Sequence, residues 1–215
     1  MDLARHGLVV LTWGNVSGID RGRGIVVIKP SGVPYENLKA DDMVAVNLDG
    51  KAVDSRLKPS SDTPTHLALY RAFAGVGGIA HTHSIHATAF AQAGVPIPCL
   101  GTTHADQFHG AVPVARMPTR KEVESGYEEN VGKVIVERFA SLDPLAVPAV
   151  LAAGHGPFTW GLTPAAAVAC SVTLEAVAHM AIATLRIRPE VSALPKHILA
   201  KHYSRKHGPA ATYGQ

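Results

Sequence analysis

The chain has 215 residues, of which 47% are hydrophobic and 17% are charged. This composition excludes intrinsic disorder, and the length suits one compact domain over residues 1–215. The net charge of +3 is too small and too scattered to indicate a nucleic-acid-binding protein. Two cysteines, Cys99 and Cys170, exclude a disulfide framework.

Membrane and export signals are also missing from the sequence pattern. No apolar stretch reaches the ~18–20 residues that span a bilayer without polar interruption. The alanine-rich run 164–185 comes nearest, and Glu175 and His179 interrupt it. The first residues lack the charged-then-apolar order of a secretory signal. We therefore expect a soluble, cytoplasmic protein with no membrane partner.

The first half of the chain mixes strand and helix signals. In chain order it predicts an apolar run at 8–13, strands at 25–29 and 43–48, a helix from 63, a strand at 77–83 and a helix at 86–93. Asp49 and Gly50 indicate a hairpin turn after the second strand. Thr63 reads as a cap residue with Pro64 at the first helical position. Gly94 ends the short helix.

The second half predicts longer helices. They cover residues 120 to about 139, 164–188 and 196–205, and a buried strand lies at 148–153. Thr119 and Glu122 have the spacing of a capping box, and Thr163 caps the alanine-rich helix. The mixture of hairpins and helices predicts an α/β fold of the α+β sandwich type. We expect a central, mostly antiparallel or mixed sheet covered by helices.

Twelve histidines are unusual for this length, and three of them suggest a metal site. His81 and His83 are two apart on a predicted strand, so their side chains point the same way. His155 lies between two glycines after a buried strand, and Asp62 offers an oxygen ligand. Three imidazoles and a carboxylate suit Zn²⁺ or a similar divalent ion. Each residue alone has an ordinary alternative, and for Asp62 this is helix capping.

Three loops of small residues suggest an anion site. They comprise residues 14–17 (GNVS), Ser31-Gly32 and Ser60-Ser61. Their backbone N–H groups and hydroxyls can form a nest for a phosphate, and Lys29 can add a positive charge. None of them matches a Walker loop or a dinucleotide fingerprint. Ordinary turn chemistry and a solvated lysine remain the alternative interpretation.

Seven sequence blocks together resemble the class II aldolase family, and within it the L-ribulose-5-phosphate 4-epimerase branch. They are LTWGNVS (11–17), IKPSGV (28–33), KPSSDTPTH (58–66), GGIAHTHS (77–84), GTTHAD (101–106), GHGPFTWG (154–161) and the tail KHYSRKHG…YGQ (201–215). The resemblance covers nearly the whole chain in order. It differs at the start, where members usually carry a helical segment before the first block. We expect that segment to be missing here.

The resemblance implies one divalent ion per subunit, usually Zn²⁺, held by His81, His83 and His155. Asp62 falls at the metal-associated acidic position, where aldolase members typically have Glu. The implied substrate-binding residues are Gly14, Asn15, Lys29, Ser31, Gly32, Ser60 and Ser61. The implied substrate is a small phosphorylated ketopentose.

The catalytic groups come from the resemblance alone. Asp106 matches an acid/base residue, Tyr213 its partner from the tail at 200–215, and His202 a supporting residue from the neighbouring subunit. A homotetramer with its sites at subunit interfaces is therefore implied. Without the resemblance, Asp106 would be an ordinary loop acid and Tyr213 an ordinary residue of a chain end.

The implied activity is an isomerase reaction that interconverts L-ribulose 5-phosphate and D-xylulose 5-phosphate. The C4 hydrogen is not adjacent to the C2 carbonyl, so simple deprotonation cannot invert C4. Retro-aldol cleavage and re-addition through a metal-stabilised enediolate avoids this problem. The implied setting is pentose phosphate metabolism, with L-arabinose degradation among the routes left open.

Other activities fit the same fold. A class II sugar-phosphate aldolase of the fuculose-phosphate type is the nearest alternative, and Asp62 and Asp106 argue against it. A ketose-phosphate dehydratase fits the tail and the GTTHAD block less well. A non-catalytic interaction domain would have no need of the complete His81, His83, His155 and Asp62 set, and a metal-storage protein would have none of the phosphate loops.

Overall fold

A computed structural model describes residues 1–208 and residue 211 of the chain. Across these residues the strands form one eight-stranded sheet in the order β4-β3-β2-β1-β5-β8-β7-β6. They are β1 (Asn15–Asp20), β2 (Ile25–Ile28), β3 (Val44–Asn47), β4 (Ala52–Asp54), β5 (Gly78–His81), β6 (Val114–Ala115), β7 (Ala149–Ala152) and β8 (Gly156–Gly161). The pair β6–β7 is parallel and the other pairs are antiparallel. The predicted mixed, mostly antiparallel sheet is thus confirmed.

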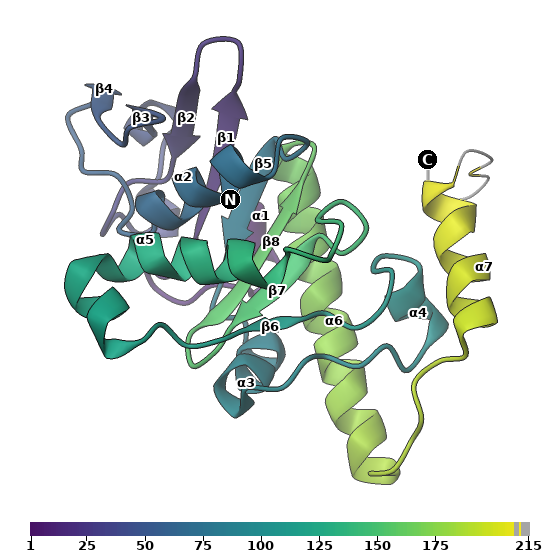
Figure 1. The fold of residues 1–215 in the computed structure, drawn as a ribbon. Coiled ribbons are helices and arrows are strands. Elements are labelled where there is room, and N and C mark those ends of the chain that lie inside the picture. The colour runs from purple at the N-terminus through teal and green to yellow at the C-terminus, as the bar shows by residue number, and fades with distance from the viewer. Residues whose placement is uncertain (209–210, 212–215) are drawn as a thin grey trace.

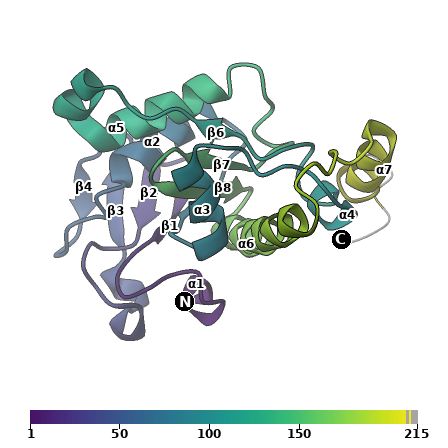
Figure 2. The same ribbon diagram turned by 90° about the horizontal axis from the view of Figure 1, so that it is seen from below.

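Helices cover both faces of this sheet. They are α1 (Asp2–Arg5), α2 (Thr63–Ala72), α3 (Ile85–Ala93), α4 (Thr102–Ala105), α5 (Arg120–Arg138), α6 (Pro164–Ile187) and α7 (Lys196–His207), with short 3₁₀ turns at Tyr35–Asn37 and Ala40–Asp42. Helices α2 and α5 lie on one side, and α3 and α6 lie on the other (Figures 1 and 2). The chain is therefore a three-layer sandwich with the sheet in the middle.

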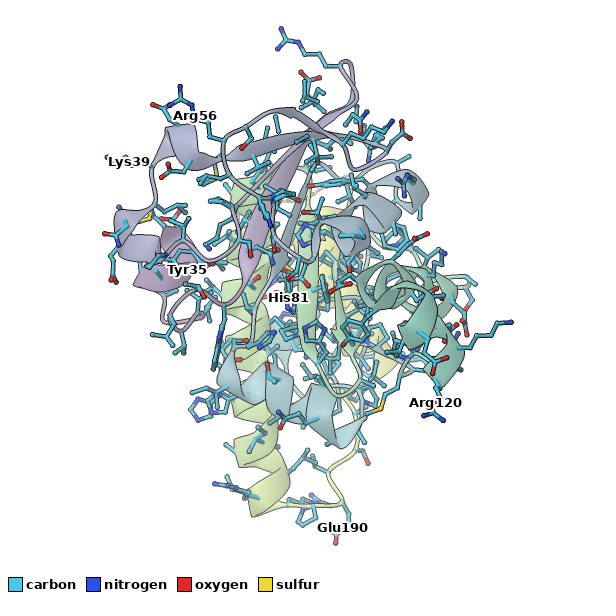
Figure 3. The ribbon with its side chains drawn as sticks, turned by 90° about the vertical axis from the view of Figure 1, so that its left-hand side faces the viewer. Tyr35, Lys39, Arg56, His81, Arg120 and Glu190 are labelled. Carbon is cyan, nitrogen blue, oxygen red and sulfur yellow. The ribbon has the colours of Figure 1, made fainter. Side chains whose placement is uncertain are left out.

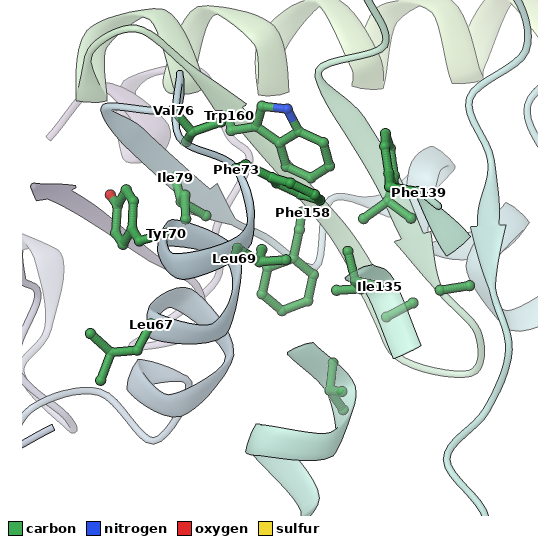
Figure 4. Packing of buried hydrophobic residues seen from close by; sticks show 14 of the residues in the cluster. Leu67, Leu69, Tyr70, Phe73, Val76, Ile79, Ile135, Phe139, Phe158 and Trp160 are labelled. Carbon is green, nitrogen blue, oxygen red and sulfur yellow. The ribbon is translucent and has the colours of Figure 1, made fainter. Parts of the chain in front are cut away.

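Each face of the sheet has its own hydrophobic core. Leu69 of α2, Phe73 directly after this helix, and Ile135 of α5 pack with Phe158 and Trp160 of β8 on one face (Figure 4). On the other face, side chains of α3 and α6 pack around Ala149 and Leu151 of β7. Period-two alternation along β7 therefore serves both cores, because successive side chains point to opposite faces.

Several local predictions are confirmed. Asp49 and Gly50 lie in the turn of the β3–β4 hairpin, where Gly50 has φ +81°. The Thr119–Glu122 capping box begins α5 with both of its hydrogen bonds. Thr163 caps α6 through the Ala166 N–H. These predictions are reliable because the hydrogen bonds of a cap or a turn form between residues only a few positions apart.

Other elements differ from the predictions in their bounds or were not predicted. No strand was predicted at β1, which begins at Asn15 after the apolar run 8–13. Asp62 occupies the N-cap position of α2, which makes Thr63 the first helical residue. The predicted strand at 77–83 ends at His81. Strand β8 was not predicted because Gly154, Gly156 and Pro157 at its start are typical of a turn. It forms because β5 and β7 supply hydrogen-bond partners on both sides.

Helix α6 is long and apolar enough by length and composition to cross a membrane. This differs from the sequence-based expectation, in which Glu175 and His179 interrupt the apolar run. The helix packs along β5 and β8, and Ala167, Leu174 and Ala178 on that side are buried. Its apolar composition therefore fits a core helix of this sandwich.

The end of the chain forms a separate arm. Helix α7 packs on α4, and both stand beyond one end of the sheet (Figure 1). The ring of His109, which follows α4, lies 4.7 Å from the ring of Tyr203 in α7, and Tyr203 stacks on His207 within α7 with ring centres 4.5 Å apart. This arm carries two of the residues for which the resemblance implies catalysis.

Candidate active site

Three histidines converge where β5 ends. His81 is the last residue of β5, His83 follows it, and His155 lies in the turn between β7 and β8. Because β8 pairs with β5, with Phe158 opposite His81, this turn comes beside the end of β5. Ligand nitrogens of the three rings lie within 4.8 Å of one another. Figure 3 shows His81 in the interior of the molecule.

The three imidazoles are held in the neutral form. Burial lowers the pKa of His81 to about 3, and burial also lowers the pKa values of His83 and His155. The Nδ1 atom of His81 lies 2.9 Å from the Pro157 carbonyl oxygen, which can only accept. The proton of His81 therefore sits on Nδ1 and leaves a lone pair on Nε2. This Nε2 lies 3.0 Å from Nε2 of His83.

His155 has a ring nitrogen without a partner. Its Nδ1 is buried and makes no hydrogen bond to any described residue. Neighbouring Gly156 lets the backbone come close, since a Cβ there would lie 2.8 Å from the Thr82 carbonyl oxygen. Neutral, converging rings with an unsatisfied nitrogen are the donor set that a divalent transition metal accepts.

Asp62 adds a carboxylate to the histidines. Although it occupies the N-cap of α2, its side chain makes no capping hydrogen bond. Instead, Oδ2 accepts from Asn15 Nδ2 at 2.7 Å and lies 3.9 Å from Nε2 of His81. Burial raises its pKa, but the nearby histidines and the Asn15 hydrogen bond outweigh burial, so the net shift is downward. The carboxylate is therefore ionised and faces the histidine cluster, as a ligand position requires.

The small-residue loops and the histidine cluster share one cavity of about 240 Å³. Every residue for which substrate binding was implied lines it, namely Gly14, Asn15, Lys29, Ser31, Gly32, Ser60 and Ser61. Asp62, His81, His83 and His155 line it as well. A phosphate-binding type of loop and a metal-binding type of cluster thus face the same space.

Contacts between the small-residue loops stabilise the wall that they form around the cavity. Pro30 and Pro59 form an isolated β-bridge, and the Ser31 N–H donates to the Lys58 carbonyl at 3.0 Å. Gly14 has φ +75°, and a Cβ there would lie 2.8 Å from the His81 carbonyl oxygen. Glycine is therefore required at position 14 on two counts, its dihedral angle and the close approach of β5.

Lys29 is buried rather than solvated. Its ammonium lies 4.9 Å from the Tyr35 ring centre and donates to the Pro30 carbonyl at 3.2 Å. Burial lowers its pKa. The Tyr35 hydroxyl in turn donates to the Gly14 carbonyl at 2.9 Å. The lysine thus adds a poorly hydrated donor to the wall of the cavity.

Sequence reasoning missed two aromatic residues near the histidines. Trp13 lines the cavity with its ring centre 6.0 Å from that of His83, and it remains 52% exposed. Tyr127 brings its ring to 6.2 Å from His155, directly after a non-helical Gly126 in α5. In the sequence, Trp13 is notable because it precedes a Gly-Asn loop, and Tyr127 is notable because it follows a glycine within a helix pattern.

Asp106 lies in a second cluster. Its carboxylate accepts from His202 Nδ1 at 3.0 Å and from Arg205 Nη2 at 2.8 Å. Burial raises its pKa, but these hydrogen bonds outweigh burial and lower it. The structure thus brings Asp106 and His202 together on the α4–α7 arm. Neither is among the residues that line the cavity of the same chain, and Tyr213 lies outside the described residues.

Comparison with known proteins agrees with this geometry. UlaF of Salmonella paratyphi B, an L-ribulose-5-phosphate 4-epimerase, is 54% identical over 215 residues, covering 100% of this chain and 94% of that protein. UlaF of Salmonella typhi gives the same identity and coverage. A solved L-fuculose 1-phosphate aldolase matches with TM-score 0.79 and 25% identity over 94% of this chain and 90% of its own. YgbL of Klebsiella pneumoniae matches with TM-score 0.72 and 27% identity over 93% of this chain and 91% of its own.

The family model described as Class II Aldolase and Adducin N-terminal domain matches residues 1–182. This range includes every cavity residue and the whole sheet. The UlaF relative, 54% identical over the full chain, agrees with this family assignment. The protein belongs to the class II aldolase and adducin N-terminal domain family.

Proposed function

We propose that the protein is a metal-dependent L-ribulose-5-phosphate 4-epimerase, an isomerase of phosphorylated ketopentoses. The observation that carries this proposal is the single cavity in which the histidine cluster faces the small-residue loops. The 54% identity to epimerases over the full chain supports the substrate. Asp62 at the acidic position supports the epimerase over an aldolase.

The reaction must invert a carbon whose hydrogen is not acidic. The C4 hydroxyl loses its proton and the C3–C4 bond breaks, leaving the enediolate of dihydroxyacetone and glycolaldehyde phosphate. The aldehyde turns to present its other face, and the enediolate adds to it while the new C4 oxygen regains a proton. No atoms are gained or lost overall, so one base and one acid suffice.

A divalent ion held by His81, His83, His155 and Asp62 would supply Lewis-acid stabilisation of negative charge on the ketose oxygens. The protein prepares this position in three ways. Burial keeps the imidazoles neutral, the Pro157 carbonyl directs the His81 proton away from the cavity, and Asn15 orients Asp62.

The loops around Ser31 and Ser60 have a different task. Their N–H groups and hydroxyls, with the Lys29 ammonium, suit the phosphate of the substrate. Retention of the phosphorylated fragment is what separates an epimerase from an aldolase, because the aldehyde must turn without leaving. The walls formed by these loops and Trp13 enclose the space in which it turns.

Acid and base are assigned to Asp106 and Tyr213, supported by His202. Since the Asp106 cluster stands on the α4–α7 arm, away from its own cavity lining, we infer that the arm serves the cavity of a neighbouring subunit. The proposal therefore includes a homotetramer with its sites at subunit interfaces. It also includes Zn²⁺ as the ion, one per subunit, a cytoplasmic location, and a role in pentose metabolism such as L-arabinose degradation.

The test is to follow L-ribulose 5-phosphate by NMR, with the purified protein before and after a chelator and after Zn²⁺ is restored. We expect chelator-sensitive conversion to D-xylulose 5-phosphate without free glycolaldehyde phosphate. Release of both fragments would instead make the protein an aldolase. No reaction after Zn²⁺ is restored would refute this substrate.

A further inference from the structure

A row of polar side chains joins α2 to β1 beneath the cavity. Asp62, His66 and Tyr70 are four residues apart and so lie along one face of the helix. Asn15 and Ser17 are two apart and point to the same face of the strand. Asn15 contacts Asp62, and Ser17 contacts both His66 and Tyr70. Below Asp62, therefore, the helix meets the strand through hydrogen bonds.

This arrangement is unusual because the lower contacts are inside the core. Ser17 Oγ lies 2.7 Å from His66 Nδ1 and 2.8 Å from the Tyr70 hydroxyl. His66 and Tyr70 are fully buried, and Tyr70 lies beside Ile79 in the apolar cluster (Figure 4). Burying three polar groups is costly unless their bonds are well formed. We call Ser17, His66 and Tyr70 the polar seam.

The polar seam leaves one ring nitrogen of His66 over. Ser17 Oγ contacts both the Tyr70 hydroxyl and His66 Nδ1, so these three side chains satisfy one another. His66 is neutral, since burial lowers its pKa to about 4, and its second ring nitrogen is Nε2. That nitrogen is buried and has no hydrogen-bond partner among the described residues.

Apolar packing alone would hold α2 less specifically. Hydrophobic contact is non-directional, so a helix can rotate or slide slightly on an apolar sheet with little loss. Directional bonds at two successive turns fix both its rotation and its position along the strand. The turn above them carries Asp62, whose Oδ2 lies 3.9 Å from Nε2 of His81. A small rotation of α2 would move this carboxylate away from the histidine cluster.

We propose that the polar seam is a set of positioning residues that fixes α2 against β1 and thereby aims Asp62 at the histidine cluster. This inference rests on the proposed metal-dependent function. Wild-type Co²⁺ binding and turnover test that function first, so the two can fail separately. A purely structural role would affect stability and leave the geometry of the metal site unchanged.

The decisive variant is Ser17→Ala/His66→Leu/Tyr70→Phe, which replaces all the polar partners together. Because no polar group is left unpaired, we expect a melting temperature near that of the wild type. Co²⁺ affinity should fall about 10- to 100-fold, as for other residues that orient metal ligands. The visible Co²⁺ spectrum should change and kcat should fall. Ser171→Ala removes a buried hydroxyl that bonds Thr159 at 2.5 Å between α6 and β8, and it serves as the matched control.

An unchanged Co²⁺ spectrum, affinity and kcat in the triple variant would overturn the proposal. If the triple variant does not fold, Tyr70→Phe decides, because it removes one hydrogen-bonding group of the polar seam and keeps the aromatic ring. We expect it to alter the His66 ¹⁵N shifts and to weaken Co²⁺ binding. A wild-type Co²⁺ affinity in Tyr70→Phe would then refute the role of the polar seam.

Discussion

At the scale of single residues, burial explains the chemistry of the histidine cluster. His81 is buried at the end of β5 and stacks on Phe158, with ring centres 4.2 Å apart. The apolar ring and the lost hydration disfavour the imidazolium form, and the Pro157 carbonyl selects the tautomer. A neutral imidazole with a directed lone pair is the form that binds a metal. Asp106, by contrast, is held ionised by Arg205 and His202.

Replacing Asp106 by Asn should separate metal binding from proton transfer. We expect the variant to retain the metal while epimerisation slows by about 10²- to 10⁴-fold, the usual contribution of an acid/base group. His155→Ala is the paired control, and it should lose both metal and turnover. Metal analysis and NMR turnover assays measure the two properties. Unchanged turnover in Asp106→Asn would refute its acid/base role.

At the scale of elements, a few tight junctions determine where the site residues lie. The β7–β8 turn brings His155 to β5, and the Gly14 loop passes against the His81 carbonyl. Just beyond His83, α3 begins with a cap supplied by a distant residue. The Glu175 carboxylate of α6 accepts from the His86 and Ala87 N–H groups at 2.9 and 3.0 Å. These junctions explain why His83 stays near His81 although β5 has ended.

Gly14→Ala tests the closest of these junctions. The new Cβ would meet the His81 carbonyl and the Val9 side chain at a positive φ, so the loop and the end of β5 must separate. We expect weaker metal binding and a clear loss of turnover, measured by Co²⁺ titration and NMR assay. Gly24→Ala in the β1–β2 hairpin has a similar φ of +66° with nothing within 4 Å, and should cost only some stability. Equal metal affinities in the two variants would contradict this account.

At the scale of the whole molecule, the α4–α7 arm stands apart from the end of β5 (Figure 1). The residues proposed as acid/base groups, Asp106 and His202, meet on this arm and do not line the cavity of the same chain. An arrangement of this kind is productive when a neighbouring subunit supplies the missing half of the site. Helix α7 contacts the rest of the chain through the His109–Tyr203 rings and the Asp106 contacts, and none of its residues belongs to either sheet core. Its orientation is therefore suited to reaching across an interface.

Mixed oligomers test this division. Co-expression of His155→Ala and Tyr213→Phe subunits should restore activity that neither variant has alone. About a quarter of the wild-type activity is expected, because each half of a site comes intact from half of the subunits. The assay is NMR turnover of the purified mixed oligomer. Activity no greater than that of the separate variants would mean that the tail serves its own chain.

Buried histidines also make the stability of the whole fold pH-dependent. Burial lowers the pKa of His104 from 6.5 to about 4, and its hydrogen bond to the Gly110 carbonyl opposes this only in part. Between these pH values the unfolded chain binds a proton that the folded chain does not. The free energy of unfolding should thus fall as pH drops from 6.5 towards 4.

His104→Gln should make that decline shallower, since the amide keeps an N–H for Gly110 and does not titrate. Urea unfolding of both proteins across this pH range measures the difference in slope. Parallel curves would show that His104 does not contribute to the pH dependence.

Features that depend on near neighbours can be predicted from the amino-acid sequence. The capping box at Thr119, the hairpin turn at Gly50 and the cap at Thr163 form between residues a few positions apart. Their sequence patterns therefore predict them. The histidine cluster could be predicted from the sequence for another reason. His81 and His83 are close in the chain, and His155 and Asp62 stand in blocks that resemble one family.

The remaining features depend on contacts between segments that are distant in the chain. Strands β1 and β8 contain glycine or proline and form because β5 lies between them, a partner remote in sequence. The same long-range pairing places the Gly14 loop at the cavity, buries Lys29 and lines up the polar seam beneath Asp62. Residues 15, 62, 81 and 155 meet through contacts between distant segments, and no local propensity encodes such contacts.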